Sequence, residues 1–241
     1  MPPPKIFKTE TLEPGAPIPV DKLKPTAWME LLVGGPYSKD GKEHRYGHTA
    51  ILVRYSGGER VYDFGRYRTI YPEKINLGIT TVNLDGDSSP RGEGILKIWT
   101  SFARYIASEN ALGRATVGYG YTIMESQAQL IVKHFLAMTR DIEPYERNAV
   151  HQRFKTRMEY FALGPNCTTV SIEAAQQAVP KIVLGSEKYI KTDGILGQDA
   201  MLGMKVQGYN VPSKLFLPAN LGSYLEGAPA IKVDKRTVYK S

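Results

Sequence analysis

The single cysteine of this chain lies where a helix is expected to begin. Cys167 follows a Gly-Pro-Asn run at 164–166 and precedes the helical residues 168–170. At a helix start, the positive end of the helix dipole and unpaired backbone amides stabilise a thiolate and lower the thiol pKa from about 8.5 toward neutrality. Cys167 is therefore a candidate nucleophile. The alternative is a small buried hydrophobic residue, the commoner role of a lone cysteine.

A thiol nucleophile needs a base, and the chain has four histidines (His44, His48, His134 and His151). His48 opens an apolar, β-branched run directly after Tyr46 and Gly47, and a glycine there allows another backbone or a substrate to come close. The other three are expected in a polar turn, a helix interior and a charged stretch. We therefore predict His48 as the base.

The segments 48–54 and 59–64 are β-branched and aromatic and flank a Tyr-Ser-Gly-Gly turn, which predicts a hairpin. With the loop at 56–57 or at 55–58, Asp63 lies opposite Ala50. It then shares a face with His48, at about 7 to 8 Å on the diagonal. Asp63 is the predicted orienter of the imidazole. A one-residue slip would place it on the opposite face, and its alternative role is a solvated strand carboxylate.

The remaining elements predict an α+β chain in two parts. Seven of the first 26 residues are proline, so 1–26 is expected to be an extended arm or a disordered tail. Residues 27–241 are expected to form one domain, with a core at 28–180 and an extension at 181–241 of loops, short strands and a tail. Helices are predicted at 94–112, from a capping box at 122–125 to about 141, and from 167 to 179. Between them, 65–93 is expected to hold one or two short strands and a loop.

Charge and composition exclude several classes of protein. The chain has 31 Lys and Arg against 24 Asp and Glu, and its net charge of +7 favours anionic partners without choosing among them. No apolar run reaches the roughly 18 to 20 residues of a membrane span, and no secretory signal is evident. No zinc, Walker or dinucleotide pattern occurs, so we expect no metal and no cofactor. We expect synthesis in the cytoplasm.

The order of these motifs resembles that of the circularly permuted NlpC-type papain-like cysteine hydrolases, which include the lecithin:retinol acyltransferase-like proteins. The similar segments are residues 47–53 (GHTAILV), 61–64 (VYDF) and 166–169 (NCTT), with a fainter match at 218–221 (PANL). The last two, with the helix that holds Gln127 and Gln129, are most similar to the bacterial branch, which includes cell-wall amidase effectors of type VI secretion. The resemblance covers roughly residues 28 to 180.

This resemblance implies a permuted papain-like fold, with an antiparallel sheet packed against helices and the nucleophile at a helix N-terminus. It implies that Cys167 is the nucleophile, His48 the general base and Asp63 the orienting residue. Two features differ from the family pattern: many relatives have His in place of Asp63, and the segment 65–93 has no clear counterpart.

The sequence thus predicts a cysteine hydrolase that cleaves amide bonds in peptidoglycan stem peptides. The Cys167 backbone amide is the expected oxyanion donor, and Tyr46 and Asn166 are expected to contact the substrate. Expected partners are peptidoglycan, an immunity protein and, through the N-terminal arm, secretion machinery, with action in the periplasm of target bacteria and no nucleic acid. The alternatives are a phospholipase or acyltransferase with the same Cys–His pair, and a non-catalytic module that binds polyanions.

Overall fold

The computed structural model describes residues 25–39, 42–44, 46–76, 81–84, 89–191 and 214–240. Of the predicted arm at 1–26, residues 1–24 lie outside this described part. The centre is an eight-stranded sheet in which every two neighbouring strands are antiparallel. In spatial order its strands are β12 (Glu146–Arg147), β13 (His151–Lys155), β10 (Ile95–Trp99), β5 (Gly58–Gly65), β4 (His48–Tyr55), β1 (Ala27–Gly34), β11 (Thr116–Ile123) and β15 (Lys235–Tyr239).

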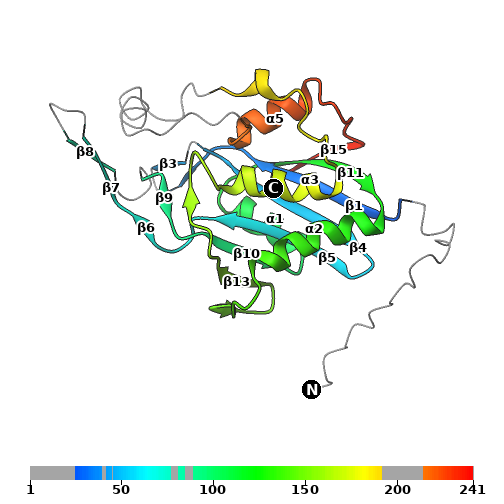
Figure 1. Cartoon of the computed structure of the whole chain (residues 1–241), viewed down its shortest axis with the longest axis horizontal. Helices are drawn as coiled ribbons and strands as arrows, with labels where there is room; N and C mark the ends of the chain where they lie inside the picture. The colour runs from blue at the N-terminus through cyan, green and yellow to red at the C-terminus, as the bar shows by residue number, and fades with distance from the viewer. Residues whose placement is uncertain are drawn as a thin grey trace.

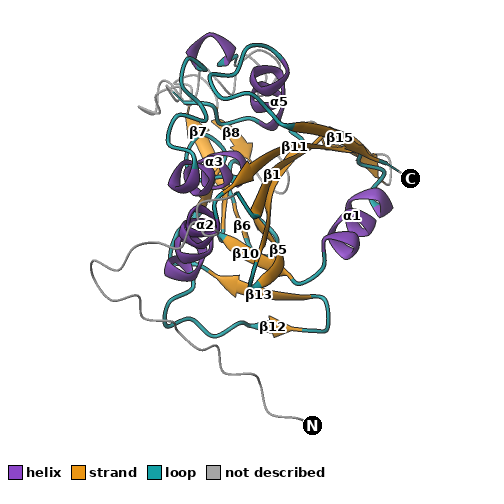
Figure 2. Cartoon of the chain, turned by 90° about the vertical axis from the view of Figure 1, so that its right-hand side faces the viewer, coloured by secondary structure: helices purple, strands orange, loops and turns teal. Residues whose placement is uncertain are grey.

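Helices cover both faces of this sheet (Figure 1, Figure 2). Helices α2 (Glu125–Met138) and α3 (Cys167–Ala178) pack on one face, and α1 (Phe102–Ala111) lies on the other. Helix α5 (Pro218–Glu226) contacts β1, next to the short 3₁₀ helix η3 (Glu187–Tyr189). The described chain is therefore an α+β protein with an antiparallel sheet between helices.

Alternation along the central strands divides the core into two hydrophobic layers. On β4, Ile51 and Val53 face α2 and α3, whereas Ala50 and Leu52 face α1. Successive side chains of a strand point to opposite faces, so one strand supplies both layers. All four side chains are fully buried. This two-sided burial makes β4 a rigid support for the residue at its first position, His48.

The predicted hairpin is confirmed. Strands β4 and β5 pair in a register in which Ile51 lies opposite Tyr62 and Tyr55 lies opposite Gly58. The loop is thus Ser56-Gly57, and continuing the register places Asp63 opposite Ala50. The one-residue slip that would have moved Asp63 to the other face does not occur.

The predicted helix at 94–112 is wrong in its first half. Ile95–Trp99 is strand β10, and α1 begins only at Phe102, after an N-cap in which Ser101 accepts the amide of Arg104. A central strand has both faces buried and loses its polar alternation, so its apolar spacing can match a helical period by chance. Pairing with β5 on one side and β13 on the other makes this segment a strand.

Helix α2 starts later than the predicted capping box. Its N-cap is Met124, whose amide donates to Gln127 Oε1 at 2.8 Å, whereas Thr122 still belongs to β11. Helix α3 runs to Ala178, as the proline at 180 predicts. In the extension 181–241, strand β15 agrees with the prediction, but α5 was not expected. A proline at its first position, Pro218, is the usual signal for such a start.

The described part of the segment 65–93 contains four short strands, more than the one or two expected. β6 (Ile70–Tyr71) and β14 (Tyr160–Phe161) flank β9 (Arg91–Gly92), while β7 (Glu73–Asn76) pairs with β8 (Thr81–Leu84). A further small pair is β2 (Tyr37–Lys39) with β3 (Lys42–His44). Strand β14 leads into the loop that ends at Cys167. The small sheet therefore lies beside the start of α3.

Candidate active site

Cys167 is the first residue of α3, as the sequence predicts. Its N-cap, Asn166, has an extended backbone, and its side-chain oxygen accepts the amides of Thr168 at 2.9 Å and Thr169 at 3.0 Å. Such a cap stabilises a helix by about 1 kcal/mol. The cap does not use the Cys167 amide, which leaves this N–H for a developing oxyanion.

Asn166 also anchors the loop around the helix start. Its Nδ2 donates to the carbonyls of Ala162 at 2.7 Å and Phe216 at 3.0 Å. Together with the two bonds of the cap, these contacts engage both ends of a carboxamide that is only 2% exposed. The structure therefore shows Asn166 building the helix start, and its predicted contact with substrate stays a prediction.

His48 is the first residue of β4, and the backbone before it requires glycine. Gly47 has φ of +67°, and a Cβ there would lie 2.4 Å from the Gly34 carbonyl oxygen. The predicted close approach is thus made by another strand of the protein, β1. This contact fixes where β4 begins and therefore where the imidazole stands.

The hairpin brings Asp63 to His48, with 2.7 Å between Asp63 Oδ1 and His48 Nε2. Tyr67 settles which atom carries the hydrogen. Its hydroxyl donates to Asp63 Oδ1, so its oxygen can only accept from Nε2, which lies 3.0 Å away. A carboxylate also only accepts. Nε2 is therefore protonated, and Nδ1 is the ring nitrogen left to exchange a proton with the thiol.

A pair of threonines joins β4 to α3. The Thr49 and Thr168 hydroxyls are 3.0 Å apart, and both side chains are fully buried. They are the direct sequence neighbours of His48 and Cys167. A buried hydroxyl pair of this kind contributes about 1 kcal/mol, and here it also sets the spacing of the two reactive groups.

The electrostatics of the three groups support one another. Burial would lower the pKa of His48, but the charge and hydrogen bond of Asp63, together with Cys167, raise it to about 10. Burial would raise the pKa of the Asp63 carboxyl, yet the charges of His48 and Lys97 hold it well below its usual range. The arrangement therefore favours an imidazolium beside an ionised Asp63 at neutral pH.

The pKa of the Cys167 thiol moves in the direction that favours a thiolate beside the His48 imidazolium. Burial raises the pKa of Cys167, but hydrogen bonds from His48, from the Thr49 amide and from Thr168, with the charge of His48, bring it below its usual value. A thiolate paired with an imidazolium is the reactive form of a cysteine nucleophile. The arrangement therefore has the form that nucleophilic attack on a carbonyl carbon requires.

Sequence reasoning missed four side chains around this centre. Trp99 and Lys97 lay in the mispredicted helix, and Tyr160 belongs to a two-residue strand. Tyr67 lies between two arginines in the segment after β5, and its hydroxyl contacts both His48 and Asp63. Only the correct strand assignment for 95–99 would have revealed the first two.

Tyr160 and Tyr46 lie on the thiol side of the centre. Burial raises the pKa of the Tyr160 phenol, and the charge of Cys167 and a hydrogen bond to its side chain raise it further. Tyr46 is close enough to add to this effect, and its own side chain is 44% exposed. Its exposure is compatible with the predicted substrate contact, which stays a prediction.

The other histidines lie on other elements than His48. His134 is on α2, and His151 is buried on β13, where its ring lies 4.7 Å from that of Trp99. His44 ends β3. Within the described residues, no group of three or more His, Cys, Asp or Glu side chains is arranged to hold a metal ion. Nor does that part of the chain contain a helix of the length and apolarity that crossing a membrane requires.

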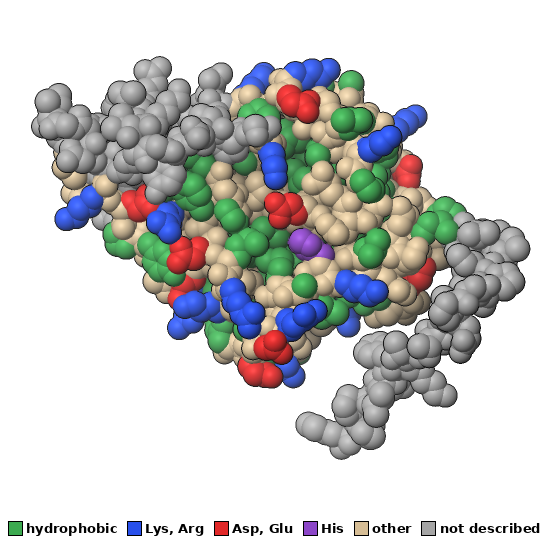
Figure 3. Space-filling view, in the orientation of Figure 1, with side chains coloured by type: hydrophobic (Ala, Val, Ile, Leu, Met, Phe, Trp, Pro, Cys, Tyr) green, Lys and Arg blue, Asp and Glu red, His purple; other side chains and the backbone are tan. Residues whose placement is uncertain are grey.

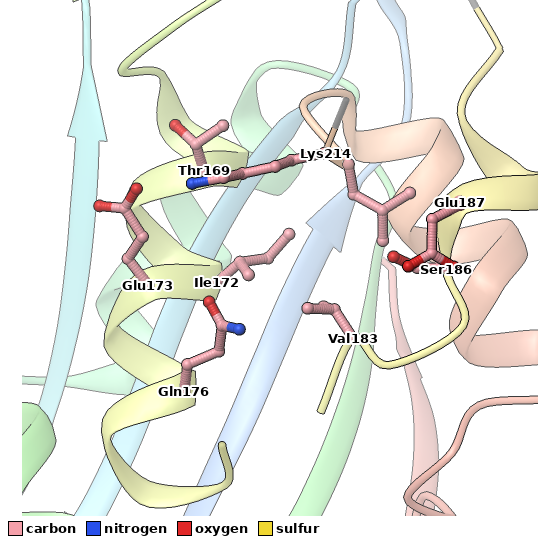
Figure 4. Close-up of a pocket in the computed structure, with 9 residues that line it drawn as sticks. Thr169, Ile172, Glu173, Gln176, Val183, Ser186, Glu187 and Lys214 are labelled. Carbon is pink, nitrogen blue, oxygen red and sulfur yellow. The ribbon is translucent and has the colours of Figure 1, made fainter. Parts of the chain in front are cut away.

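A cavity of about 200 Å³ lies along the outer side of α3 (Figure 4). Thr169, Glu173 and Gln176 line it from the helix, and Val183 and Lys214 line it from the facing segments. Cys167, His48 and Asp63 are not among the residues that line it. The cavity is thus separate from the chemistry described above.

Comparisons with protein-family models, with curated proteins and with solved structures found no match for this chain. The functional conclusion therefore depends on the geometry of the site and on the resemblance of its motifs.

Proposed function

We propose that this protein is a cysteine hydrolase with a permuted papain-like fold, which cleaves amide bonds in peptidoglycan stem peptides. The observation that carries the proposal is the meeting of Cys167, His48 and Asp63. The three residues come from a helix start and two adjacent strands, and all are less than 10% exposed. Their order along the chain is the one expected of the permuted family.

In the first half of the reaction, the Cys167 thiolate attacks the carbonyl carbon and forms a carbon–sulfur bond. The displaced electron pair moves to the carbonyl oxygen, where the Cys167 amide donates a hydrogen bond to it. Such a donor lowers the barrier by about 3 kcal/mol. His48 Nδ1 then gives its proton to the amide nitrogen, the carbon–nitrogen bond breaks and the amine leaves.

In the second half, water hydrolyses the thioester. His48 Nδ1 takes a proton from the water as its oxygen attacks the acyl carbon, and the carbon–sulfur bond breaks to restore the thiolate. Asp63 stays ionised throughout and holds Nε2–H, so the same nitrogen faces the reaction in both halves.

The peptidoglycan substrate rests on the resemblance to the bacterial branch and on the net charge of +7, which suits an anionic polymer. Lys and Arg side chains are interspersed with acidic ones on the face shown in Figure 3 and do not form one block. The described part of this face therefore has no single basic patch of the kind that a polyanion-binding module would use. Export into competing bacteria and an immunity protein in the producer follow from the same resemblance.

The test compares the chain with Cys167→Ala. Each is directed to the periplasm of a host bacterium, and each is incubated with purified peptidoglycan whose fragments are identified by mass. We expect lysis and new stem-peptide fragments only with the intact thiol. Ser171→Ala is the matched control, because Ser171 is buried on the same helix one turn away.

Two outcomes would overturn the assignment. Equal behaviour of the chain and Cys167→Ala would remove the catalytic role of the thiol. Release of fatty acid from vesicles, while cell walls stay uncut, would show that the same Cys–His pair acts on lipid esters.

A further inference from the structure

We propose that Tyr67, Lys97 and Trp99 are positioning residues that keep the Asp63 carboxylate an oriented anion, Tyr67 and Trp99 through hydrogen bonds and Lys97 through its charge. The inference rests on the proposed function, because it concerns how the Cys167–His48 pair is held ready. It does not depend on which acyl group is cleaved.

The carboxylate of Asp63 is surrounded by donors on both oxygens. Oδ1 accepts from His48 Nε2 and from the Tyr67 hydroxyl. Oδ2 accepts from Trp99 Nε1 at 3.3 Å and lies 4.0 Å from Lys97 Nζ. A carboxylate offers about four lone-pair positions. Three of them accept hydrogen bonds, and the Lys97 ammonium adds an ion pair on the Oδ2 side, so these contacts hold the carboxylate in its orientation toward His48.

Strand β10 supplies two of these donors through its register. Lys97 lies directly opposite Asp63, and Trp99 lies opposite Val61. Residues two apart on a strand point to the same face, so Lys97 and Trp99 both stand over the Asp63 side of the sheet. The Trp99 ring is further held edge-on against Tyr105, with centroids 5.8 Å apart.

Tyr67 covers the His48–Asp63 pair from the segment after β5. Its ring meets that of His48 edge-on at 6.1 Å, and Lys97 Nζ lies 3.1 Å from the centroid of its ring. Lys97 therefore touches both Asp63 and the residue that covers it. Stacking a cation on an aromatic ring is favourable, more so away from water.

The charges in this region balance. Lys97 and protonated His48 are positive, whereas Asp63 and the Cys167 thiolate are negative. The side chain of Lys97 is 13% exposed and those of His48 and Asp63 less than 10%. Removing charges from water is costly unless each is paired and hydrogen-bonded. The three positioning residues meet this condition for Asp63, so its carboxylate does not need to take the proton of His48 Nε2.

The experiment removes one donor at a time and keeps the ring. Trp99→Phe and Tyr67→Phe delete a single N–H or O–H. Trp28→Phe is the matched control for the first, because the Trp28 indole donates to Glu30 at 3.0 Å, away from the site. Tyr105→Phe is the control for the second, since among the described residues its buried hydroxyl has no hydrogen-bond partner.

The main measurement is the ionisation of Cys167, followed by the ultraviolet absorbance of its thiolate across a pH titration. The signal is the difference from the same variant carrying Cys167→Ala, so the sequence's only cysteine is isolated. We expect each test variant to raise the midpoint by about half a pH unit, with kcat on peptidoglycan about tenfold lower and KM unchanged. The controls should move neither quantity.

The outcomes separate this inference from the proposed function. A low midpoint in the parent chain that stays unchanged in Trp99→Phe and Tyr67→Phe, with circular dichroism showing that both fold, would overturn the positioning role alone. If the midpoint of thiolate formation shifts as expected but the parent chain leaves peptidoglycan uncut, the positioning role would be supported and the proposed substrate overturned. A parent midpoint at the value of a free thiol would overturn both.

Discussion

His48 and His151 are two histidines of one sheet with the same exposure, 7%, and each lies close to a carboxylate. Their pKa values nevertheless move in opposite directions. That of His48 is raised to about 10, whereas that of His151 is lowered. Trp99 contacts both environments, through its ring at His151 and through its N–H at Asp63.

The difference lies in the partners. Burial lowers the pKa of each imidazole, but the carboxylate beside His48 is itself buried, with a side chain 3% exposed. The side chain of Glu146, the partner of His151, is 39% exposed. The positive charges of Arg153 and Lys97 further lower the pKa of His151. A charge screened by water interacts less strongly than one in the interior. A buried carboxylate, rather than burial alone, therefore makes the proposed catalytic base.

Replacing each histidine gives the largest contrast. We expect His48→Gln to lower the rate of stem-peptide release by about 10⁴-fold, because the proton relay is lost. His151→Gln should stay within about twofold of the parent, because the His151 ring packs on Trp99 and its Nε2 contacts Glu146. The measurement is the initial rate of fragment release from peptidoglycan. A comparable loss in His151→Gln would end the distinction between the two.

Replacing each carboxylate tests the cause of the contrast. Asp63→Asn removes the charge that stabilises the imidazolium, so the midpoint of thiolate formation should rise by about one pH unit and the rate should fall by about 10²-fold. Glu146→Gln, on the exposed side, should change neither. The absorbance titration measures the first and the peptidoglycan digest the second. An unchanged midpoint in Asp63→Asn would show that the carboxylate does not control the pair.

Alkaline pH should reveal His48 in the stability of the protein. Its folded pKa of about 10 exceeds the ordinary value of about 6.5, so its contribution is full below pH 6.5 and is lost as pH rises through about 10. The loss is at most about 1.4 kcal/mol per pH unit. Urea unfolding of Cys167→Ala between pH 7 and 10 measures the part of this effect that Asp63 supplies, because the variant lacks the thiol that also raises the pKa of His48. Adding Asp63→Asn should make the free energy of unfolding depend less on pH in this range. An unchanged dependence would contradict the proposed pairing of His48 with Asp63.

His151 should give the smallest effect, at acid pH. Its folded pKa lies below its ordinary value, so the unfolded chain binds the proton more readily and stability falls as pH drops below about 6.5. His151→Phe should reduce this acid loss of stability and leave the alkaline one intact. Urea unfolding at pH 5 and pH 7 tests this, and an unchanged acid loss in the variant would show that His151 does not contribute.

Local signals in the sequence were sufficient for the thiol and the hairpin. The Gly-Pro-Asn run before Cys167 is enough to predict that a helix starts there. The Ser-Gly loop by itself sets the register that aligns Asp63 with His48. The segment 95–99 shows the limit. Its apolar spacing suits a helix, and only its position between β5 and β13 makes it a strand. With that strand misassigned, Lys97 and Trp99 could not be placed at Asp63.

The sequence by itself determined the candidate nucleophile, the base and the orienting carboxylate, because helix caps and tight turns are encoded by adjacent residues. Tertiary structure alone decided that these groups meet. The contact between Thr49 and Thr168 spans 119 positions, and that between Trp99 and Asp63 spans 36. Such contacts depend on how separate elements pack, and no local pattern records which donors will surround a buried carboxylate.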